Sequence, residues 1–228
     1  MHHHIHILLE DNHYLILNKP AGILVQPDNS KDPSLVDLAK EYLKKAYNKP
    51  GKVFCEAAHR IDRPVSGLII LAKTSKGVER MNELFRLKQI QKTYWAIVEQ
   101  KPPMQEERLT HWLRKENGRN ISKAYDHEAV NSQKAELSYK LLQQLEGNRW
   151  LLEVNLHTGR HHQIRLQLSH IGCPILGDVK YRSHRPTGDH CIALHAREIK
   201  FAHPISKEAI EIKAPLPDKK YWEGCFEV

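Results

Sequence analysis

Short apolar runs recur along the chain and predict strands. Residues 14–17 form a buried run that closes in a turn, Asn-Lys-Pro-Ala-Gly, at 18–22. Residues 68–72 are continuously apolar, which is typical of a strand buried on both faces. Residues 23–25 are expected to resume extended structure, and the same patterns predict further strands at 92–98, 150–156, 191–201 and 209–213.

Three other segments have helical spacing. Asp32 and Pro33 fit an N-cap and a first helical residue, so we expect a helix from there to the Lys-Pro-Gly at 49–51. Its apolar stripe comprises Leu35, Leu38, Tyr42, Leu43 and Ala46. A second helix is expected to be capped by Ser75, with apolar positions Val78, Met81, Leu84 and Phe85. A third is expected to begin near Arg160, with Ile164, Leu168 and Ile171 buried.

Residues 101–132 are polar and include the turn signal Asn117-Gly118, so we expect an exposed hairpin or arm there. Many strands and few helices in non-alternating order predict an α+β fold, a mixed, largely antiparallel sheet with flanking helices. We expect one domain over 1–228, with 1–9 an irregular or tag-derived start. His2–His4 fit either a tag remnant or native sequence.

Composition favours a polyanionic partner. The chain has 35 Lys and Arg against 27 Asp and Glu, a formal charge of +8. Its four cysteines are widely spaced and do not have the spacing typical of zinc ligands, which favours reduced thiols. With no apolar run long enough for a membrane span and no leader-like start, we expect a cytoplasmic protein without a membrane partner.

The candidate chemistry centres on the stretch His-Arg-Ile-Asp-Arg-Pro-Val-Ser-Gly at 59–67. Asp62 lies between Arg60 and Arg63, and nearby positive charge favours an ionised carboxylate. Such a group can act as a nucleophile or a base. The alternative is that Asp62 caps a turn and the arginines are solvated.

This stretch resembles the signature of the RluA-type pseudouridine synthases, with Ile61 and Val65 in place of the usual Leu and Thr. Further segments resemble other motifs of that family in the same order along the chain; they lie at 18–22, 92–98, 158–165, 172–178, 194–196, 201–204 and 214–217. The resemblance implies a pseudouridine-synthase-like catalytic domain with a central active-site cleft. The chain departs from the family at its N-terminus, where many members carry a small RNA-binding domain that we do not expect here.

The resemblance assigns three catalytic residues. Asp62 would attack carbon or remove a sugar proton, Arg165 would pair with Asp62, and Tyr94 would stack on the target base and could accept the C5 proton. Arg165 follows the apolar Ile164 by one position, so we expect it to face a cleft. Taken alone, Arg165 could bind phosphate or a surface acid, and Tyr94 could belong to the core.

The remaining candidates would bind substrate. The resemblance implies that Arg60 enters the space left when the target nucleotide flips out of the RNA. Flipping is required because the reacting atoms are inaccessible in a stack. The other predicted substrate-binding residues are His59, Arg63, Lys19, Arg160, His162 and Gln163. Lys19, Arg160 and the cations of 76–92 are candidates for RNA phosphate contacts, with a solvated role as the alternative.

His157, His161 and His162 suggest a metal site, but no acidic ligand lies between them. We therefore predict no metal and no cofactor. The leading hypothesis is an RNA pseudouridine synthase that acts as a monomer on structured ribosomal or transfer RNA, with no required protein partner. The alternatives are a catalytically inactive RNA-binding protein of the same fold and a metal-dependent hydrolase built on these histidines.

Overall fold

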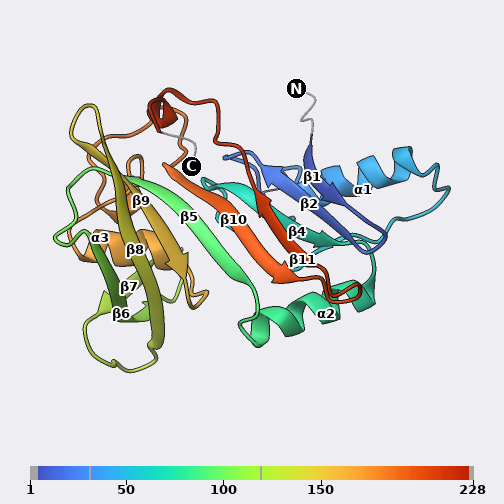
Figure 1. The fold of residues 1–228 in the computed structure, drawn as a ribbon, viewed down its shortest axis with the longest axis horizontal. Coiled ribbons are helices and arrows are strands. Elements are labelled where there is room, and N and C mark those ends of the chain that lie inside the picture. The colour runs from blue at the N-terminus through green and yellow to red at the C-terminus, as the bar shows by residue number, and fades with distance from the viewer. Residues whose placement is uncertain (1–4, 31, 119, 226–228) are drawn as a thin grey trace. The chain divides into compact units, whose positions relative to one another are not determined.

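The computed structural model describes residues 5–30, 32–118 and 120–225 and divides the chain into two compact units. Unit 1 comprises Met1–Ile90 and Ala196–Pro217, and unit 2 comprises Gln91–His195 and Asp218–Val228. Each unit has a largely antiparallel set of strands flanked by helices, which confirms the α+β prediction (Figure 1). His2–His4, whose origin the sequence left open, lie outside the described residues.

The sheet of unit 1 has the order β1-β2-β4-β10, with β3 also paired to β4 and β11 to β10. Its strands are β1 (His6–Glu10), β2 (Tyr14–Lys19), β3 (Glu56–Ala57), β4 (Ser66–Ala72), β10 (Leu194–Ala202) and β11 (Ala209–Lys213). The predicted buried runs are confirmed, since every residue of β4 is buried. At 23–25, where extended structure is expected, Leu24 forms an isolated β-bridge with Ser34.

Helix α1 (Leu35–Ala46) covers one face of this sheet. It packs on Leu15 and Leu17 of β2 and on Ile69 and Leu71 of β4. The residues it buries are Leu35, Val36, Ala39 and Leu43, so the predicted stripe was partly misplaced.

The N-cap of α1 is Ser34, not Asp32. The Ser34 hydroxyl accepts a hydrogen bond from the Asp37 backbone N–H, and the Asp37 carboxylate accepts one from the Ser34 backbone N–H. This capping box satisfies two donors at the start of the helix. Asp32 instead forms an ion pair with Arg63, at 2.8 Å.

Helix α2 (Ser75–Arg86) lies on the opposite face of the unit 1 sheet from α1 (Figure 1). The Tyr14 hydroxyl donates to the Gly77 carbonyl at 3.1 Å, and Met81 is buried. Its N-cap is Thr74, whose hydroxyl accepts from the Gly77 N–H, one residue before the predicted Ser75.

The sheet of unit 2 has the order β5-β9-β8-β6-β7. Its strands are β5 (Gln91–Val98), β6 (Glu106–Lys115), β7 (Ser122–Tyr125), β8 (Gln133–Leu145) and β9 (Arg149–Leu156). Strands β6 and β7 form the predicted hairpin, with a turn at Asn117-Gly118. The expectation that this region is exposed is wrong for β6, which lies between β7 and β8 and buries Leu109, His111 and Leu113.

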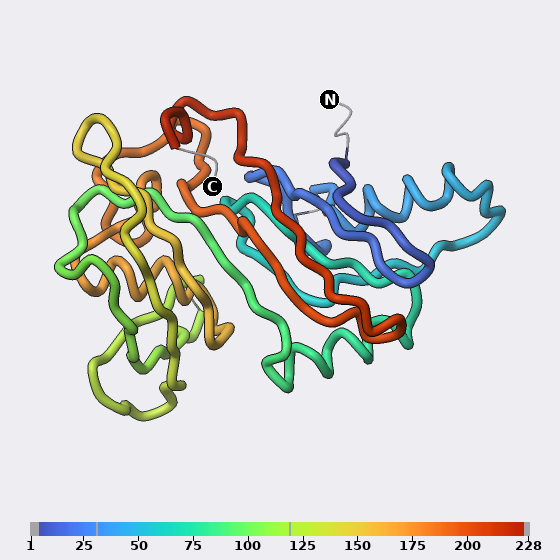
Figure 2. The backbone as a smooth tube through the Cα atoms, in the orientation of Figure 1, coloured from blue at the N-terminus to red at the C-terminus, as the bar shows by residue number. Residues whose placement is uncertain are grey.

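Helix α3 (Gln163–His170) packs on this sheet, where Leu166 joins Leu113 and Ala135 in a small apolar cluster. It begins three residues later than expected, after His162 in the left-handed conformation. The connection from α3 to β10 contains the short helix η1 (Val179–Tyr181) and hydrogen-bonds to β5 through the Leu176 N–H and the Ile97 carbonyl (Figure 2). The last helix of the described chain is the short helix η2 (Lys220–Trp222). No helix in the described ranges is long and apolar enough to cross a membrane.

Gly67 is the position in unit 1 where a side chain fits worst. Its φ is +111°, and a Cβ there would lie 2.6 Å from the Ala196 backbone nitrogen. We predict that Gly67→Ala lowers the free energy of unfolding by about 3 kcal/mol, because left-handed strain adds to a backbone overlap. Gly51→Ala is the matched control, since nothing lies near its Cβ, and should change stability by less than about 0.5 kcal/mol. Equal denaturation midpoints for the two variants would contradict this prediction.

Candidate functional site

Asp62 lies half-buried in the loop that leads into β4. The Val65 N–H donates to the Asp62 carbonyl at 3.1 Å, which makes the loop a tight turn. Ile61 and Val65 tie this turn to the interior, since Ile61 packs against the core under α1 and Val65 is buried. The two departures from the family motif thus fill apolar positions on either side of the carboxylate.

A buried lysine holds the Asp62 loop to the turn after β2. Lys19 is 0% exposed, and its Nζ donates to the carbonyls of Pro20 at 2.9 Å, Ile23 at 2.8 Å and Arg63 at 3.2 Å. An ammonium has three donor hydrogens, so these three contacts match its capacity. The prediction that Lys19 contacts RNA phosphate is wrong, because its charge is enclosed by backbone carbonyls.

Arg63 strengthens the same junction from outside. Its Nε donates to the Gly22 carbonyl at 2.9 Å, its guanidinium pairs with Asp32, and its own carbonyl accepts from the Gly22 N–H at 2.8 Å. Arg63 therefore has a structural role at this junction, and its predicted contact with substrate stays a prediction.

His59 and Arg60 flank Asp62 on the other side. The His59 Nε2 accepts a hydrogen bond from the Ile70 N–H at 3.0 Å, and its ring packs against Phe85 of α2. His59 thereby fixes the loop to β4. Arg60 is exposed, as a residue that enters RNA must be.

Arg165 of α3 is buried, with 4% of its surface exposed. Its Nε and Nη2 donate to the two carboxylate oxygens of Asp178 at 2.7 and 2.8 Å, and its guanidinium lies over the Tyr181 ring. Such a bidentate pair fixes the plane of the guanidinium. Every residue of α3 from Gln163 to Ser169 is buried, so Arg165 is not on a solvent-exposed side of the helix, and the expectation that it faces a cleft stays a prediction.

Asp178 was not among the residues predicted for the site. Its sequence signal was available, since it ends the motif at 172–178 directly after Gly177, whose φ is +86°. Tyr181 was also missed, and it connects two predicted residues: its ring contacts Arg165 and its hydroxyl lies 2.8 Å from the His162 Nδ1.

The turn before α3 is held by the side chain of Gln163. The Gln163 Oε1 accepts from the Thr158 hydroxyl and the Arg160 N–H, while its Nε2 donates to the Glu136 carbonyl. Gln163 is buried and shapes the turn, and its predicted contact with substrate stays a prediction. His162 is also buried and stacks on His161, with ring centroids 3.7 Å apart.

Tyr94 lies on β5, opposite Val154 of β9, and is 7% exposed. Lys92 precedes it by two positions on the same strand, and burial lowers the pKa of the Lys92 ammonium. Asp62 belongs to unit 1, whereas Tyr94 and Arg165 belong to unit 2. The pairing of Asp62 with Arg165 stays a prediction.

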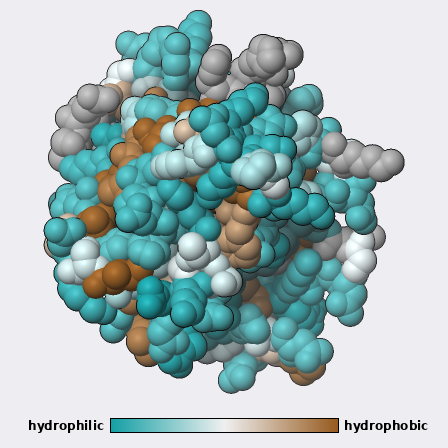
Figure 3. Space-filling view, turned by 90° about the vertical axis from the view of Figure 1, so that its right-hand side faces the viewer, coloured by the Kyte–Doolittle hydropathy of each residue, from teal (hydrophilic) through white to brown (hydrophobic). Residues whose placement is uncertain are grey.

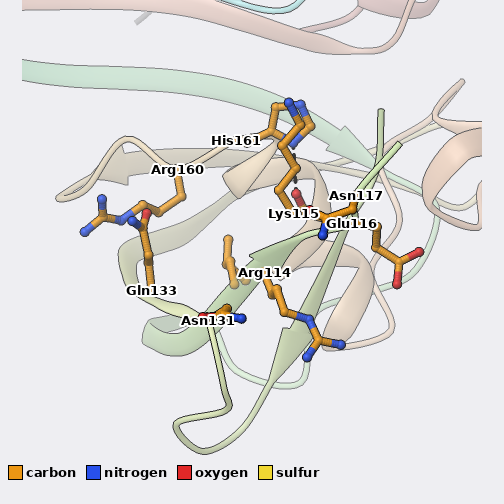
Figure 4. Close-up of a pocket in the computed structure, with 10 residues that line it drawn as sticks. Arg114, Lys115, Glu116, Asn117, Asn131, Gln133, Arg160 and His161 are labelled. Atoms are coloured by element: carbon orange, nitrogen blue, oxygen red, sulfur yellow. Dashed lines mark hydrogen bonds between the residues drawn. The ribbon is translucent and has the colours of Figure 1, made fainter. Parts of the chain in front are cut away.

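A pocket of about 750 Å³ opens between the β6–β7 hairpin, β8 and the turn before α3 (Figure 4). Three of its lining residues are permanent cations: Arg114, Lys115 and Arg160. Arg160 is exposed, and in Figure 4 it and Arg114 lie on different sides of the pocket. The prediction of a cation at Arg160 that can reach phosphate is consistent with this position.

The molecular face drawn in Figure 3 is mostly hydrophilic, with small apolar patches scattered over it. The exposed large apolar residues of the described chain are spread along the sequence from Tyr47 to Ile205. Isolated exposed apolar residues of this kind need no partner to cover them.

Comparisons with known proteins identify the family. Residues 13–170 match the family model described as RNA pseudouridylate synthase. A ribosomal large subunit pseudouridine synthase C from Rickettsia bellii is 34% identical over 214 residues, which cover 93% of this chain and 68% of that protein. The protein of the same name from Vibrio cholerae is 31% identical over 226 residues, 92% of this chain and 65% of that protein.

Solved structures have the same fold. Human RNA pseudouridylate synthase domain containing 4 superposes with a TM-score of 0.78 at 23% identity, over 93% of this chain and 89% of that one. Human RNA pseudouridylate synthase domain containing 1 gives 0.74 at 20% identity, over 94% and 84%. The sequence match includes the Asp62 loop, β5 and all of α3, and this chain belongs to the RNA pseudouridylate synthase family.

Proposed function

We propose that this RNA pseudouridine synthase modifies uridine in RNA of the large ribosomal subunit, with Asp62 as the catalytic carboxylate. The names of the relatives support the choice of RNA, and transfer RNA is the second candidate. The observation that carries the proposal is the fixed position of Asp62. Its loop, inside the family match, is locked by the buried Lys19 ammonium and by Arg63.

The reaction breaks the N1–C1′ bond of uridine, turns the uracil, joins C5 to C1′ and removes the C5 proton. Asp62 either attacks a carbon of the nucleotide or removes a sugar proton; both need an ionised carboxylate in a fixed position. The locked loop supplies that position before substrate arrives. No electrons enter or leave, so the reaction as we propose it needs no redox cofactor.

Arg165 and Tyr94 complete the proposed site. Arg165 pairs with Asp62, which keeps the carboxylate ionised, and Asp178 holds the Arg165 guanidinium in one plane. Tyr94 stacks on the uracil and is the candidate acceptor for the C5 proton. The family match runs through both units, which supports our proposal that 1–228 works as one catalytic domain.

RNA binding is proposed to use exposed cations. Arg60 enters the stack when the target nucleotide leaves it, and the pocket lined by Arg114, Lys115 and Arg160 contacts phosphates. His162 supports the pocket region through its contact with Tyr181, and His59 supports the Arg60 region through its hydrogen bond with β4. We propose that the protein acts as a monomer with no required protein partner.

The first test replaces the carboxylate. Asp62→Asn should reduce pseudouridine formation at least roughly 10³-fold, as expected when a catalytic acid–base group or nucleophile is lost, while RNA affinity stays within about threefold. Pseudouridine in large-subunit RNA and in transfer RNA made without the modification is the readout. The exposed Asp218→Asn is the control and should keep full activity.

Full activity of Asp62→Asn would reject the assigned role. A wild-type protein that binds both RNAs and modifies neither would favour the alternative of a catalytically inactive RNA-binding protein. Modification of transfer RNA alone would leave the mechanism in place and overturn the choice of substrate.

Arg165→Lys tests the bidentate contact with Asp178. A lysine keeps the charge but forms only one such bond, so we expect a loss of about 2–3 kcal/mol in unfolding free energy and roughly 10²-fold in kcat, with a smaller change in KM. The control is Arg86→Lys, an exposed arginine paired with Glu83, which should cost less than about 1 kcal/mol. A variant that is destabilised and yet has the wild-type kcat would show that Arg165 is structural only.

The pocket cations are tested by the salt dependence of RNA binding. Arg160→Gln should weaken binding and reduce the slope of log affinity against log salt by about one, because one fewer phosphate is neutralised. Lys45→Gln, an exposed cation of α1 outside the pocket, should leave the slope unchanged. Identical slopes for wild type and Arg160→Gln would remove this pocket from the RNA-binding surface.

A further inference from the structure

A cluster of two histidines and an aspartate forms in unit 2, away from the histidines that drew attention in the sequence. His111 comes from β6, Asp126 directly follows β7, and His170 ends α3. One side-chain ligand atom from each lies within 4.8 Å of the other two. Two imidazoles and a carboxylate are a donor set typical of zinc sites that keep an open fourth position.

The ligand atoms of the cluster are spaced nearly as they would be around a bound ion. The His170 Nε2 lies 2.8 Å from the Asp126 Oδ1, and the His111 Nε2 lies 3.9 Å from the same oxygen. Tetrahedral zinc, with bonds of about 2.0–2.2 Å, holds its ligand atoms about 3.3 Å apart. The contacts therefore need adjustments of about an ångström, and the exposed Asp126 carboxylate and the half-exposed His170 ring have room to make them.

A second group stands behind His111. Gln167 is fully buried, and its Oε1 has no hydrogen-bond partner among the described residues. Its Nε2 lies 3.0 Å from the His111 Nδ1 and only 3.3 and 3.5 Å from the carbonyls of Ala135 and Leu109.

In this arrangement the His111 Nδ1 accepts and its Nε2 carries the proton. Turning the Gln167 amide over would place Oε1 against Nδ1, so that Nδ1 donates and the Nε2 lone pair is released towards Asp126. The unpartnered oxygen would gain a hydrogen bond, but the amide nitrogen would lose its contacts with both carbonyls and Oε1 would lie beside them instead. The turn therefore occurs only when the metal bond to the His111 Nε2 outweighs this cost. A hydrogen-bond acceptor behind the ring fixes the tautomer of a metal-binding histidine.

We propose that His111, Asp126 and His170 bind a divalent transition-metal ion of the zinc class, with Gln167 as the group that orients His111. The ion would join β6, the end of β7 and the end of α3, the helix that carries Arg165. The site is independent of the proposed catalytic chemistry, and its test does not use activity.

The experiment compares zinc binding to wild type, His170→Ala, Asp126→Asn and His127→Ala by titration calorimetry. His127 is the matched control, because it is an exposed histidine next to Asp126 that does not belong to the cluster. Wild type and His127→Ala should bind about one more zinc per chain than His170→Ala. Histidines near the N-terminus contribute equally to all four proteins and cancel in the difference.

Thermal unfolding gives the second readout. Zinc should raise the Tm of wild type and His127→Ala by several degrees more than that of His170→Ala and Asp126→Asn, because an ion that binds only the folded state stabilises it. Without metal, all four should unfold at similar temperatures, since Asp126 is exposed and His170 is partly exposed. Cobalt in place of zinc should give the visible absorption of a tetrahedral site in wild type and lose it in His170→Ala.

Equal zinc stoichiometry and equal Tm shifts in wild type and His170→Ala would overturn the proposal. Gln167→Leu tests the orienting role separately and should weaken zinc about 10–100-fold with unchanged stoichiometry. Unchanged affinity in that variant would remove Gln167 from the site.

Discussion

The buried ammonium of Lys19 is the interaction on which the Asp62 loop depends. Three backbone carbonyls from two turns surround it, and both turns contain sequence motifs of the family. A charge removed from water is stable only if its donors are satisfied, so the carbonyls cannot separate without exposing an unpaired cation. The buried Lys19 ammonium thus holds the Asp62 loop in place from the inside, and Arg63 holds it from the surface. A catalytic carboxylate needs this kind of support, because its own side chain must stay available to substrate.

The elements with the strongest apolar runs could be predicted from the sequence, and the ends of the helices could not. β2, β4 and β5 lie where the runs at 14–17, 68–72 and 92–98 placed them. For α1, Asp32-Pro33 and Ser34 are both suitable starts. Ser34 is preferred because Asp37, three residues on, completes a capping box, whereas the residue three after Asp32 is the apolar Leu35. β6 was mistaken for an exposed arm because its alternation of buried and exposed positions is hidden in a polar composition.

The candidate residues were found by motif, but what each side chain contacts depends on neighbours that are distant in sequence. Arg165 was expected to face a cleft because it lies one position beyond Ile164 in the apolar stripe of Ile164, Leu168 and Ile171. In the structure Leu166, outside that stripe, joins the apolar cluster of the sheet, and the connection bearing Asp178 and Tyr181 covers Arg165. Helical periodicity locates a single buried face and gives no sign of a second layer. The contacts of Gln163 were hidden for the same reason, since its partners Thr158 and Glu136 belong to the preceding turn and to β8.

The formal charge of +8 therefore combines cations with different tasks. Lys19 and Arg165 are internal and hydrogen-bond to carbonyls or a carboxylate, so neither presents its charged group at the surface. Arg63 is exposed but has an acidic partner. The attraction for a phosphate chain must come from exposed cations such as Arg60 and Arg160, and these lie next to the residues that the buried cations hold in place. Substitution of an internal cation should act through geometry and stability, whereas substitution of an exposed one should act through salt-dependent affinity. The burial of each cation, rather than the net charge, thus determines which part it plays in the enzyme.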